Sequence, residues 1–258
     1  MSTNAPNAPN APANNAPVEL LYPELGNQGG DNGNAMYIEA CLSAEQIVRT
    51  SHNDKPYFVD NDPAAIMIGG TTEAQQELIV SRLMSYRERL IELTDAGVPM
   101  LFSGNASELL GAKIIRSDGS SFEALGLFDF VTRRYMPKRF HDVQVGVFNP
   151  GNGADPFDVV GFKMQFTLTE GDNSDCYFIE NRVGFGINKE SKLEGFRRNN
   201  VIATEIIGPL LPLNPLLTRW FLDAMGKQDA ALAFEEEAMA AYEKHAREMV
   251  YPGMHLHY

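Results

Sequence analysis

Short apolar runs alternate with helix signals along the first half of the chain. The run VELLYPEL, which begins at Val18, predicts a strand, and the loop after it leads into a helix expected to begin near Asn34. Further strands are predicted at residues 46–51, 64–68 and 98–103. Strands that alternate with helices are typical of an α/β domain built on a parallel sheet.

The clearest helix is predicted between Thr72 and Gly97. Its apolar residues follow one another at intervals of four and three positions, so they form one stripe that can pack on a sheet. Thr71 or Thr72 is expected to cap its start, and Gly97 to end it. The stripe consists of Ile79, Leu83, Tyr86, Leu90 and Leu93.

The pattern changes after Ile114, where the apolar runs become shorter and turns separate them. Alternating residues such as Val143, Val145 and Val147 indicate strands with one exposed face, which we expect to form an antiparallel extension of the sheet. A last buried strand is predicted at residues 201–207.

The end of the chain is predicted to be helical. The prolines of GPLLPLNP, residues 208–215, force a turn before the helix LLTRWFLDAM. A C-terminal amphipathic helix is predicted from Asp229 to Met249. Packing on the domain is its simplest interpretation, and docking of a partner subunit is the alternative.

Composition and charge narrow the classes of partner. The chain has 258 residues and a formal net charge of -13, which repels phosphate backbones and anionic lipids, so we expect neither nucleic acid nor membrane insertion. Residues 1–17 repeat Asn-Ala-Pro and predict a disordered tail, followed by one domain at 18–226 and a C-terminal helix and tail at 227–258. Without a spanning run or a signal-peptide pattern, the protein is expected to be cytoplasmic.

The two cysteines, Cys41 and Cys176, are expected to be reduced thiols. Neither has a histidine motif beside it, which argues against catalysis by either thiol. The terminal HLHY offers two histidines without a third ligand, so no metal is expected, and no cofactor is expected either.

Six segments agree, in order, with one protein family. They are YPELGNQGGDNGN (22–34), IGGTTEAQQ (68–76), PMLFSGNASELLG (99–111), LGLFDFVTRR (125–134), VGFKMQF (160–166) and NVIATEIIGPLLPLNP (200–215). Through them the chain resembles the class I glutamine amidotransferases of the cobyric acid synthase type, and within these the amidotransferase subunits of lipid II isoglutaminyl synthases. The resemblance covers nearly everything from Val18 to Leu222.

This resemblance implies a flavodoxin-like α/β fold, with a mostly parallel sheet flanked by helices. It also implies a cysteine and a histidine that hydrolyse glutamine to glutamate and ammonia. The ammonia passes to a Mur ligase-like partner subunit, which uses ATP to activate a carboxylate. In the lipid II isoglutaminyl synthases, that reaction amidates a precursor of the peptidoglycan cell wall.

Both catalytic residues of the family are missing from the matching positions. The resemblance puts the nucleophile at Gly104 and the histidine at Ile207, and Lys163 and Gln165 stand where the family has glutamate and histidine. Asn105 follows the nucleophile position in place of a glycine. Because a thiol and its imidazole act as a unit, the loss of either typically slows turnover about a millionfold. These joint changes predict a catalytically degenerate subunit that is not a glutaminase by itself.

Part of a ligand site is expected to survive. By the resemblance, Arg139 matches an arginine that holds the substrate glutamine, although a surface salt bridge explains it equally well. Gly69, Gly70 and Asn105 complete the predicted site, which would take glutamine or another small amino acid.

Two other functions stay open. An active amidotransferase or another hydrolase would use repurposed residues, and a stand-alone structural or regulatory protein would associate through its C-terminal helix. Ser103 and Ser107 flank the nucleophile position, but neither has a general base in the expected place. The other candidates for repurposed chemistry are Lys163, Glu205 and His141.

Overall fold

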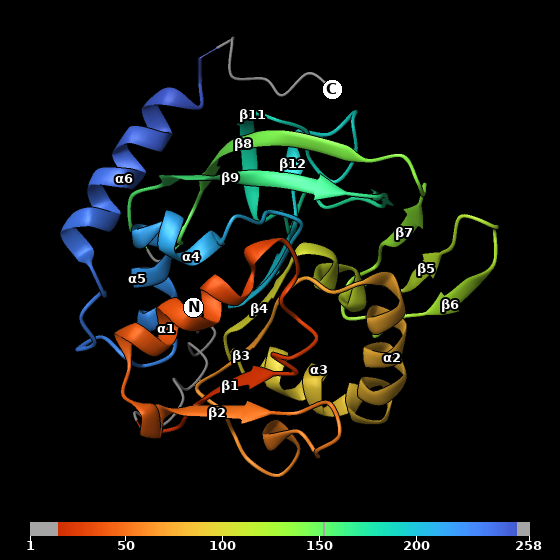
Figure 1. The fold of residues 1–258 in the computed structure, drawn as a ribbon, viewed down its shortest axis with the longest axis horizontal. Coiled ribbons are helices and arrows are strands. Elements are labelled where there is room, and N and C mark those ends of the chain that lie inside the picture. Colours follow the sequence, from red (N-terminus) through yellow and green to blue (C-terminus); the bar gives the residue numbers. More distant parts are fainter. Residues whose placement is uncertain (1–14, 152, 252–258) are drawn as a thin grey trace, which may run out of the picture.

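A six-stranded sheet in the order β13-β14-β4-β3-β1-β2 forms the centre of the computed structural model, which describes residues 15–151 and 153–251 (Figure 1). All its neighbouring pairs are parallel except β13 with β14. The order β2-β1-β3-β4-β14 is that of flavodoxin-like doubly wound sheets, which confirms the predicted fold class. The strands are β1 (Val18–Leu21), β2 (Ile47–Thr50), β3 (Ala65–Ile68), β4 (Met100–Ser103), β13 (Phe196–Arg198) and β14 (Val201–Thr204).

Successive side chains of these strands enter two separate hydrophobic cores. In β4, Met100 and Phe102 belong to one core, while Leu101 belongs to the other. In β14, Ile202 shares the core of Leu101. Because both faces are covered, these strands appear in the sequence as continuous apolar runs.

Helices cover the two faces of the sheet (Figure 1). One face carries α2 (Glu73–Leu83) and α3 (Arg87–Asp95). The other carries α1 (Asn32–Cys41), α4 (Leu210–Leu213) and α5 (Pro215–Ala224). The structure also contains short 3-10 turns, which are η1 (Gln28–Gly30), η2 (Ala44–Gln46), η3 (Tyr57–Val59), η4 (Met84–Tyr86) and η5 (Gly104–Leu110).

The helix predicted between Thr72 and Gly97 is present but divided. Thr72 caps α2 through a reciprocal pair of hydrogen bonds with Gln75, as the capping signal predicted. The 3-10 turn η4 then separates α2 from α3, which the apolar spacing did not reveal. The stripe still faces the sheet, with all its members buried except the half-buried Tyr86.

The shorter runs after Ile114 form two further four-stranded sheets instead of extending the main one. The first, in the order β10-β7-β5-β6, joins β5 (Lys113–Ile115), β6 (Ser121–Glu123), β7 (Val131–Arg134) and β10 (Thr167–Glu170). The second, in the order β12-β11-β8-β9, joins β8 (Phe140–Phe148), β9 (Phe157–Gln165), β11 (Ile179–Val183) and β12 (Leu193–Glu194). In the main sheet, only β13 adds an antiparallel strand.

The C-terminal helix α6 (Glu235–Glu248) begins later than the predicted Asp229 and packs against the beginning of β9 and against α4 and α5 (Figure 1). Its Tyr242 is 8% exposed and donates its hydroxyl to the carbonyl oxygen of Asp158, 2.7 Å away. The predicted tail at 1–17 and the terminal HLHY lie mainly outside the described residues. In the described chain, no helix is long and apolar enough to cross a membrane.

Candidate functional site

The loops after the carboxyl ends of β1, β3, β4 and β14 meet at one edge of the main sheet. Ligands of open α/β sheets bind at this edge, where the strand order reverses. Here the order reverses between β1 and β3. The loops contribute Asp31, Gly70, Gly104 and Ile207, in chain order.

Gly104 occupies a sharp bend between β4 and the 3-10 turn η5. Its φ of 57° lies in the left-handed region, which glycine adopts without the strain that an L side chain brings. A Cβ at this position would lie 3.1 Å from Cα of Gly70, 3.3 Å from Cγ2 of Ile207 and 3.5 Å from Oδ2 of Asp31. A side chain here would therefore point into the space between these three residues.

Ile207 closes the opposite side of that space. The predicted strand at 201–207 ends at Thr204, and Ile207 instead forms a bridge to β9. Its N–H donates to the carbonyl oxygen of Phe162 at 2.8 Å, and its own carbonyl accepts from the Phe162 N–H at 3.1 Å. The end of the Ile207 side chain also reaches toward Gly29, where a Cβ would lie 3.0 Å from Cδ1 of Ile207. An apolar side chain thus stands directly opposite the bend at Gly104.

Asp31 is a buried carboxyl beside this pair that the sequence did not single out as titratable. It is 2% exposed and accepts hydrogen bonds from the Gly70 N–H at 2.9 Å, the Asn34 amide at 3.1 Å and the Ser103 hydroxyl. Burial raises the pKa of Asp31 to about 6, against these hydrogen bonds, which lower it.

Asn105 ties the loop after β3 to the bend. Its Oδ1 accepts from the Thr71 N–H at 2.7 Å, and its Nδ2 donates to the Thr71 carbonyl oxygen at 2.9 Å. The N–H groups of Gly70 and Thr71 are therefore both occupied by side chains, those of Asp31 and Asn105. Neither N–H is free to stabilise a developing oxyanion in this arrangement.

A cavity of about 240 Å³ opens beside Gly104 and Ile207. It brings together three of the four predicted ligand-binding residues, namely Gly70, Asn105 and Arg139. Gly69 lines a separate cavity of about 300 Å³, and its backbone packs tightly against Gly26. The remaining polar lining includes Gln165, Thr167 and the carboxyls of Glu108 and Glu205.

Arg139 lies at the exposed rim of this cavity. Its guanidinium is 5.0 Å from the ring centroid of Phe166. Among the described residues, no carboxylate forms an ion pair with Arg139, so the surface salt bridge considered from the sequence is not formed there.

Glu108 and Glu205 form a buried carboxyl pair at the cavity. They are 2% and 9% exposed, and a hydrogen bond joins them. Glu108 also accepts from the Thr167 hydroxyl and the Gln76 amide, both at 2.7 Å, while Glu205 accepts from the Ser107 hydroxyl at 3.2 Å. Burial raises the pKa of both carboxyls, and the neighbouring Glu108 raises that of Glu205 further. Glu108 lies within the motif segment 99–111, but no pattern there marked it as a site residue.

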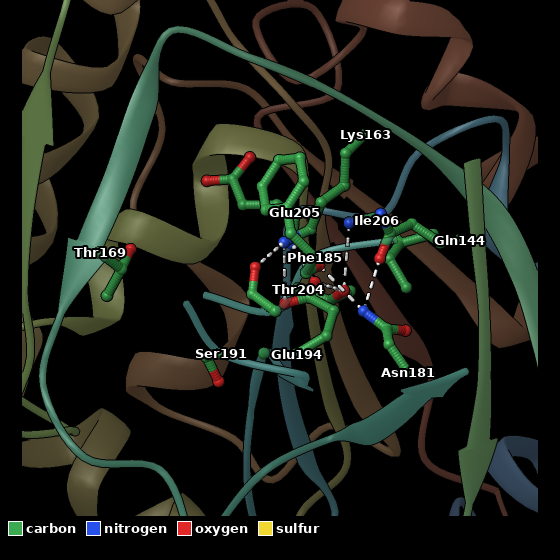
Figure 2. Close-up of polar contacts among 12 residues, drawn as sticks. Gln144, Lys163, Thr169, Asn181, Phe185, Ser191, Glu194, Thr204, Glu205 and Ile206 are labelled. Carbon is green, nitrogen blue, oxygen red and sulfur yellow. Dashed lines mark hydrogen bonds and ion pairs between the residues drawn. The ribbon is translucent and has the colours of Figure 1, made fainter. Parts of the chain in front are cut away.

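Lys163 lies in the interior next to Glu205 (Figure 2). Its ammonium donates to the Gly186 carbonyl oxygen at 2.6 Å and pairs with Glu194 at 3.2 Å. Glu194 in turn accepts from the Thr204 hydroxyl at 2.7 Å and the Glu205 N–H at 3.1 Å. Lys163 is therefore held by its own carboxylate partner and lines a neighbouring cavity of about 660 Å³.

The other candidates for repurposed chemistry lie in different surroundings. Ser103 and Ser107 are buried, and their hydroxyls bind Asp31 and Glu205 respectively. His141 is half-buried on β8, where it pairs in register with Met164 and also lines the cavity of about 660 Å³. Cys41 and Cys176 are free and half-buried, and burial raises the pKa of both thiols.

Comparison with known proteins identifies relatives of this chain. Residues 37–214 match the CobB/CobQ-like glutamine amidotransferase domain. The chain is 30% identical over 156 residues to the protein named lipid II isoglutaminyl synthase (glutamine-hydrolyzing) subunit GatD from Staphylococcus aureus (strain N315). That alignment covers 60% of this chain and 61% of the relative, which is less than two thirds of its length.

One solved structure supports the fold. A crystal structure of a glutamine amidotransferase superposes with a TM-score of 0.52 at 14% identity, over 81% of this chain and 98% of that one. PurLQS from Thermotoga maritima matches with a TM-score of 0.49 at 13% identity, over 89% of this chain and 98% of that one.

Proposed function

This chain belongs to the class I glutamine amidotransferases with a CobB/CobQ-like domain, and from that premise we propose that it is a catalytically degenerate member. In this proposal the protein binds a small ligand in the cavity beside Gly104 and works as a subunit of a larger enzyme. It does not hydrolyse glutamine by itself.

The contact between Gly104 and Ile207 carries this proposal. The resemblance assigns the nucleophile and the histidine of the family to these two positions, and the structure brings them to 3.3 Å measured from an ideal Cβ at Gly104. Neither residue has a group that can attack a carbonyl or move a proton. The two positions therefore retain the spatial relationship that a catalytic pair requires, without its chemistry.

The surrounding hydrogen bonds support the same conclusion. Acyl transfer requires donors that point at the developing oxyanion, and the loss of one such donor costs roughly 100-fold to 1000-fold in turnover. The N–H groups of Gly70 and Thr71 are engaged with Asp31 and Asn105. The Asn105 amide oxygen thus occupies an N–H group of this loop that a substrate oxygen could otherwise use.

Retained polar groups around the cavity support ligand binding. Arg139 stands at the rim without a carboxylate partner among the described residues, and Gly70 and Asn105 line the same space. A guanidinium in this position suits the carboxylate of a small amino acid. Glutamine or another small amino acid is therefore the proposed class of ligand.

The proposed partner is a Mur ligase-like, ATP-dependent subunit. The S. aureus relative is named as a subunit of a glutamine-hydrolyzing lipid II isoglutaminyl synthase. By analogy we propose that this chain binds or regulates such a ligase in peptidoglycan precursor amidation or a related pathway. A cytoplasmic setting, expected from the sequence, is part of this proposal.

A glutaminase assay tests the proposal. The purified protein, alone and with a Mur ligase-like subunit and ATP, is incubated with glutamine, and the released ammonia is measured. We expect no release above that of buffer, whereas the S. aureus relative should release ammonia as the positive control. Turnover at about 1 per second or faster, an ordinary enzymatic rate, would overturn the proposal.

Complex formation is a separate measurement. Size-exclusion chromatography with light scattering of the two proteins together should give the mass of a complex, with ATP present. If the two proteins elute separately under all conditions, the ligase is not the partner. If the chain associates only with itself, the stand-alone alternative is favoured.

A further inference from the structure

The cavity beside Gly104 has a floor that contains more hydrogen-bond acceptors than donors. Its buried carboxyls, from Glu108 and Glu205, come from η5 and the loop after β14, and the amide of Gln165 comes from β9. The half-buried Glu73, at the start of α2, lines the same cavity. We propose that this floor recognises a cationic nitrogen group, an ammonium or guanidinium, and that its binding expels the proton shared by Glu108 and Glu205. This inference rests on the proposed function, in which the cavity binds a ligand without hydrolysing it.

Gln165 supplies an observation that is independent of the carboxyls. Its side chain is 4% exposed, and its Nε2 donates to the Thr167 carbonyl oxygen at 2.8 Å. This bond fixes the amide, because a reversed amide would place two oxygens against each other. In residues 15–151 and 153–251, no donor forms a hydrogen bond with Gln165 Oε1, which is buried. A buried acceptor without a donor costs about 1–3 kcal/mol, which a ligand N–H would recover.

The carboxyl pair requires a compensating positive charge. Two adjacent carboxylates repel each other, so one proton remains between them when nothing else neutralises the second charge. The charged groups that face Glu205 are Glu108, Lys163 and Glu194. Lys163 is already paired with Glu194, so it lowers the pKa of Glu205 only from a distance.

Glu108 also lacks a cation that is free to neutralise the carboxyl pair. The charged groups that face it are Glu205 and Arg134. The guanidinium of Arg134 is engaged with Glu77 at 2.8 Å and with the amide oxygen of Gln76 at 2.5 Å. Both bases of this region thus have their own partners, and a proton is left to bridge the pair.

A cationic ligand can replace that proton with charge conserved. Before binding, Glu205 carries the proton and donates a hydrogen bond to the Glu108 carboxylate. After binding, both carboxylates are ionised, the ligand cation lies against them, and the proton is released to the solvent. A neutral amide such as that of glutamine brings N–H donors but no charge, so it cannot drive this exchange. The N–H groups of the cation also satisfy Gln165 Oε1.

The rim of the cavity is suited to the carboxylate at the opposite end of the ligand. Arg139 is exposed and has no carboxylate partner among the described residues, so it can hold a ligand carboxylate. A cavity of about 240 Å³ is smaller than typical drug-sized sites and suits a single amino acid. The ligand class is therefore a basic amino acid, with its cationic end at the floor and its carboxylate at the rim.

Isothermal titration calorimetry on the full chain tests whether the cavity prefers a basic amino acid. The probes are L-arginine, L-lysine, glutamine and L-citrulline, the last being a neutral analogue of arginine. We expect arginine or lysine to bind at least about tenfold more tightly than citrulline. Measurements in buffers with different ionisation enthalpies should show up to one proton released per ligand, and affinity should rise with pH.

Variants that leave the fold intact test the role of the carboxyl pair. Glu205→Gln should abolish proton release and weaken the preference for arginine over citrulline, because Glu108 keeps its charge. The control Glu180→Gln, at an exposed carboxyl on β11, should leave both unchanged. Circular dichroism verifies that each variant is folded. Equal binding of arginine and citrulline, binding without proton release, or no binding of the basic probes at millimolar concentration overturns the inference. If glutamine binds more tightly than the basic probes and is not hydrolysed, this inference is wrong but the proposed function stands. If ammonia is released, the proposed function is wrong.

Discussion

An ideal Cβ on Gly104 lies 3.3 Å from Cγ2 of Ile207, so the two residues face each other across the carboxyl edge of the main sheet. They are separated by more than a hundred positions in the sequence, and the parallel pairing of β4 with β14 brings them together. The bend at Gly104 combines a positive φ with close neighbours, and these two constraints can be separated by mutation.

The substitution Gly104→Ala should destabilise the protein more than the matched change Gly119→Ala. Both glycines have positive φ, 57° and 88°, where an L residue is strained by about 1–2 kcal/mol. A methyl group at 119 has no neighbour within 4 Å, whereas at 104 it lies 3.1 Å from Cα of Gly70. We expect Gly104→Ala to lose about 1 kcal/mol more, from overpacking. Urea unfolding of both variants measures this difference, and equal losses would show that the bend has room for a side chain.

Restoring the expected pair should activate a thiol without restoring hydrolysis. In Gly104→Cys/Ile207→His, the imidazole would stand beside the thiol and stabilise the thiolate. We expect alkylation by iodoacetamide at pH 7 to be about tenfold faster than in Gly104→Cys alone, which corresponds to a thiol pKa lower by about one unit. The wild-type protein gives the background from Cys41 and Cys176.

The same double variant should release no ammonia from glutamine, because the N–H groups of Gly70 and Thr71 are engaged with Asp31 and Asn105. If the two variants are alkylated at the same rate, residues 104 and 207 do not cooperate as proposed. If the double variant hydrolyses glutamine, the engaged N–H groups are not limiting.

Local patterns in the sequence predicted the parallel strands and the cap at Thr72, because both depend on neighbours along the chain. The break at η4 and the late start of α6 escaped prediction, since an apolar stripe continues through both. Alternating residues such as Val143 and Val145 predicted strands but could not assign them to a separate sheet. Sheet membership depends on contacts between distant segments.

In the candidate site, too, some residues could be predicted from the sequence and others could not. The positions Gly104 and Ile207 were assigned by motif resemblance, and Arg139, assigned in the same way, lines the same cavity. The pairing of Glu108 with Glu205 could not be foreseen, because they are almost a hundred residues apart and neither lies in a charge pattern. Buried polar networks arise from tertiary packing and have little local signature.

Lys163→Met should strongly destabilise the protein. The ammonium of Lys163 is fully buried and paired with Glu194, and removal of one member of a buried pair costs about 3–5 kcal/mol, because the other charge is left uncompensated. The matched control is Lys55→Met, which removes an exposed pair with Asp60 and should change stability by less than about 1 kcal/mol. Urea unfolding at pH 7 measures both.

A double variant separates charge from packing at this position. In Lys163→Met/Glu194→Gln the uncompensated carboxylate is gone, so this protein should be more stable than Lys163→Met alone. If Lys163→Met is no more damaging than Lys55→Met, the buried pair contributes nothing. If the double variant is less stable than the single, the hydrogen bonds that Glu194 accepts from Thr204 and Glu205 outweigh its charge.

Asp31 should make the protein less stable as pH rises from about 4 to 6. Burial raises the pKa of Asp31 from 3.8 to about 6, so the folded state binds its proton more tightly than the unfolded state does. This contribution is fully present below the unfolded pKa and is lost as pH rises through the folded pKa. Because one pKa unit corresponds to 1.36 kcal/mol, the loss should approach about 3 kcal/mol.

The difference in unfolding free energy between Asp31→Asn and the wild type isolates this contribution. The pKa values of Glu24 and Glu77 are lowered to about 2, so these residues make both proteins more stable as pH rises. Their contributions are the same in the two proteins and cancel in the subtraction. The stability of Asp31→Asn relative to wild type should therefore rise between pH 4 and 6 and then level off. The control Asp54→Asn, at an exposed position, should give a difference with no such rise. A flat difference for Asp31→Asn would mean that the ionised carboxylate is fully compensated by Gly70, Asn34 and Ser103.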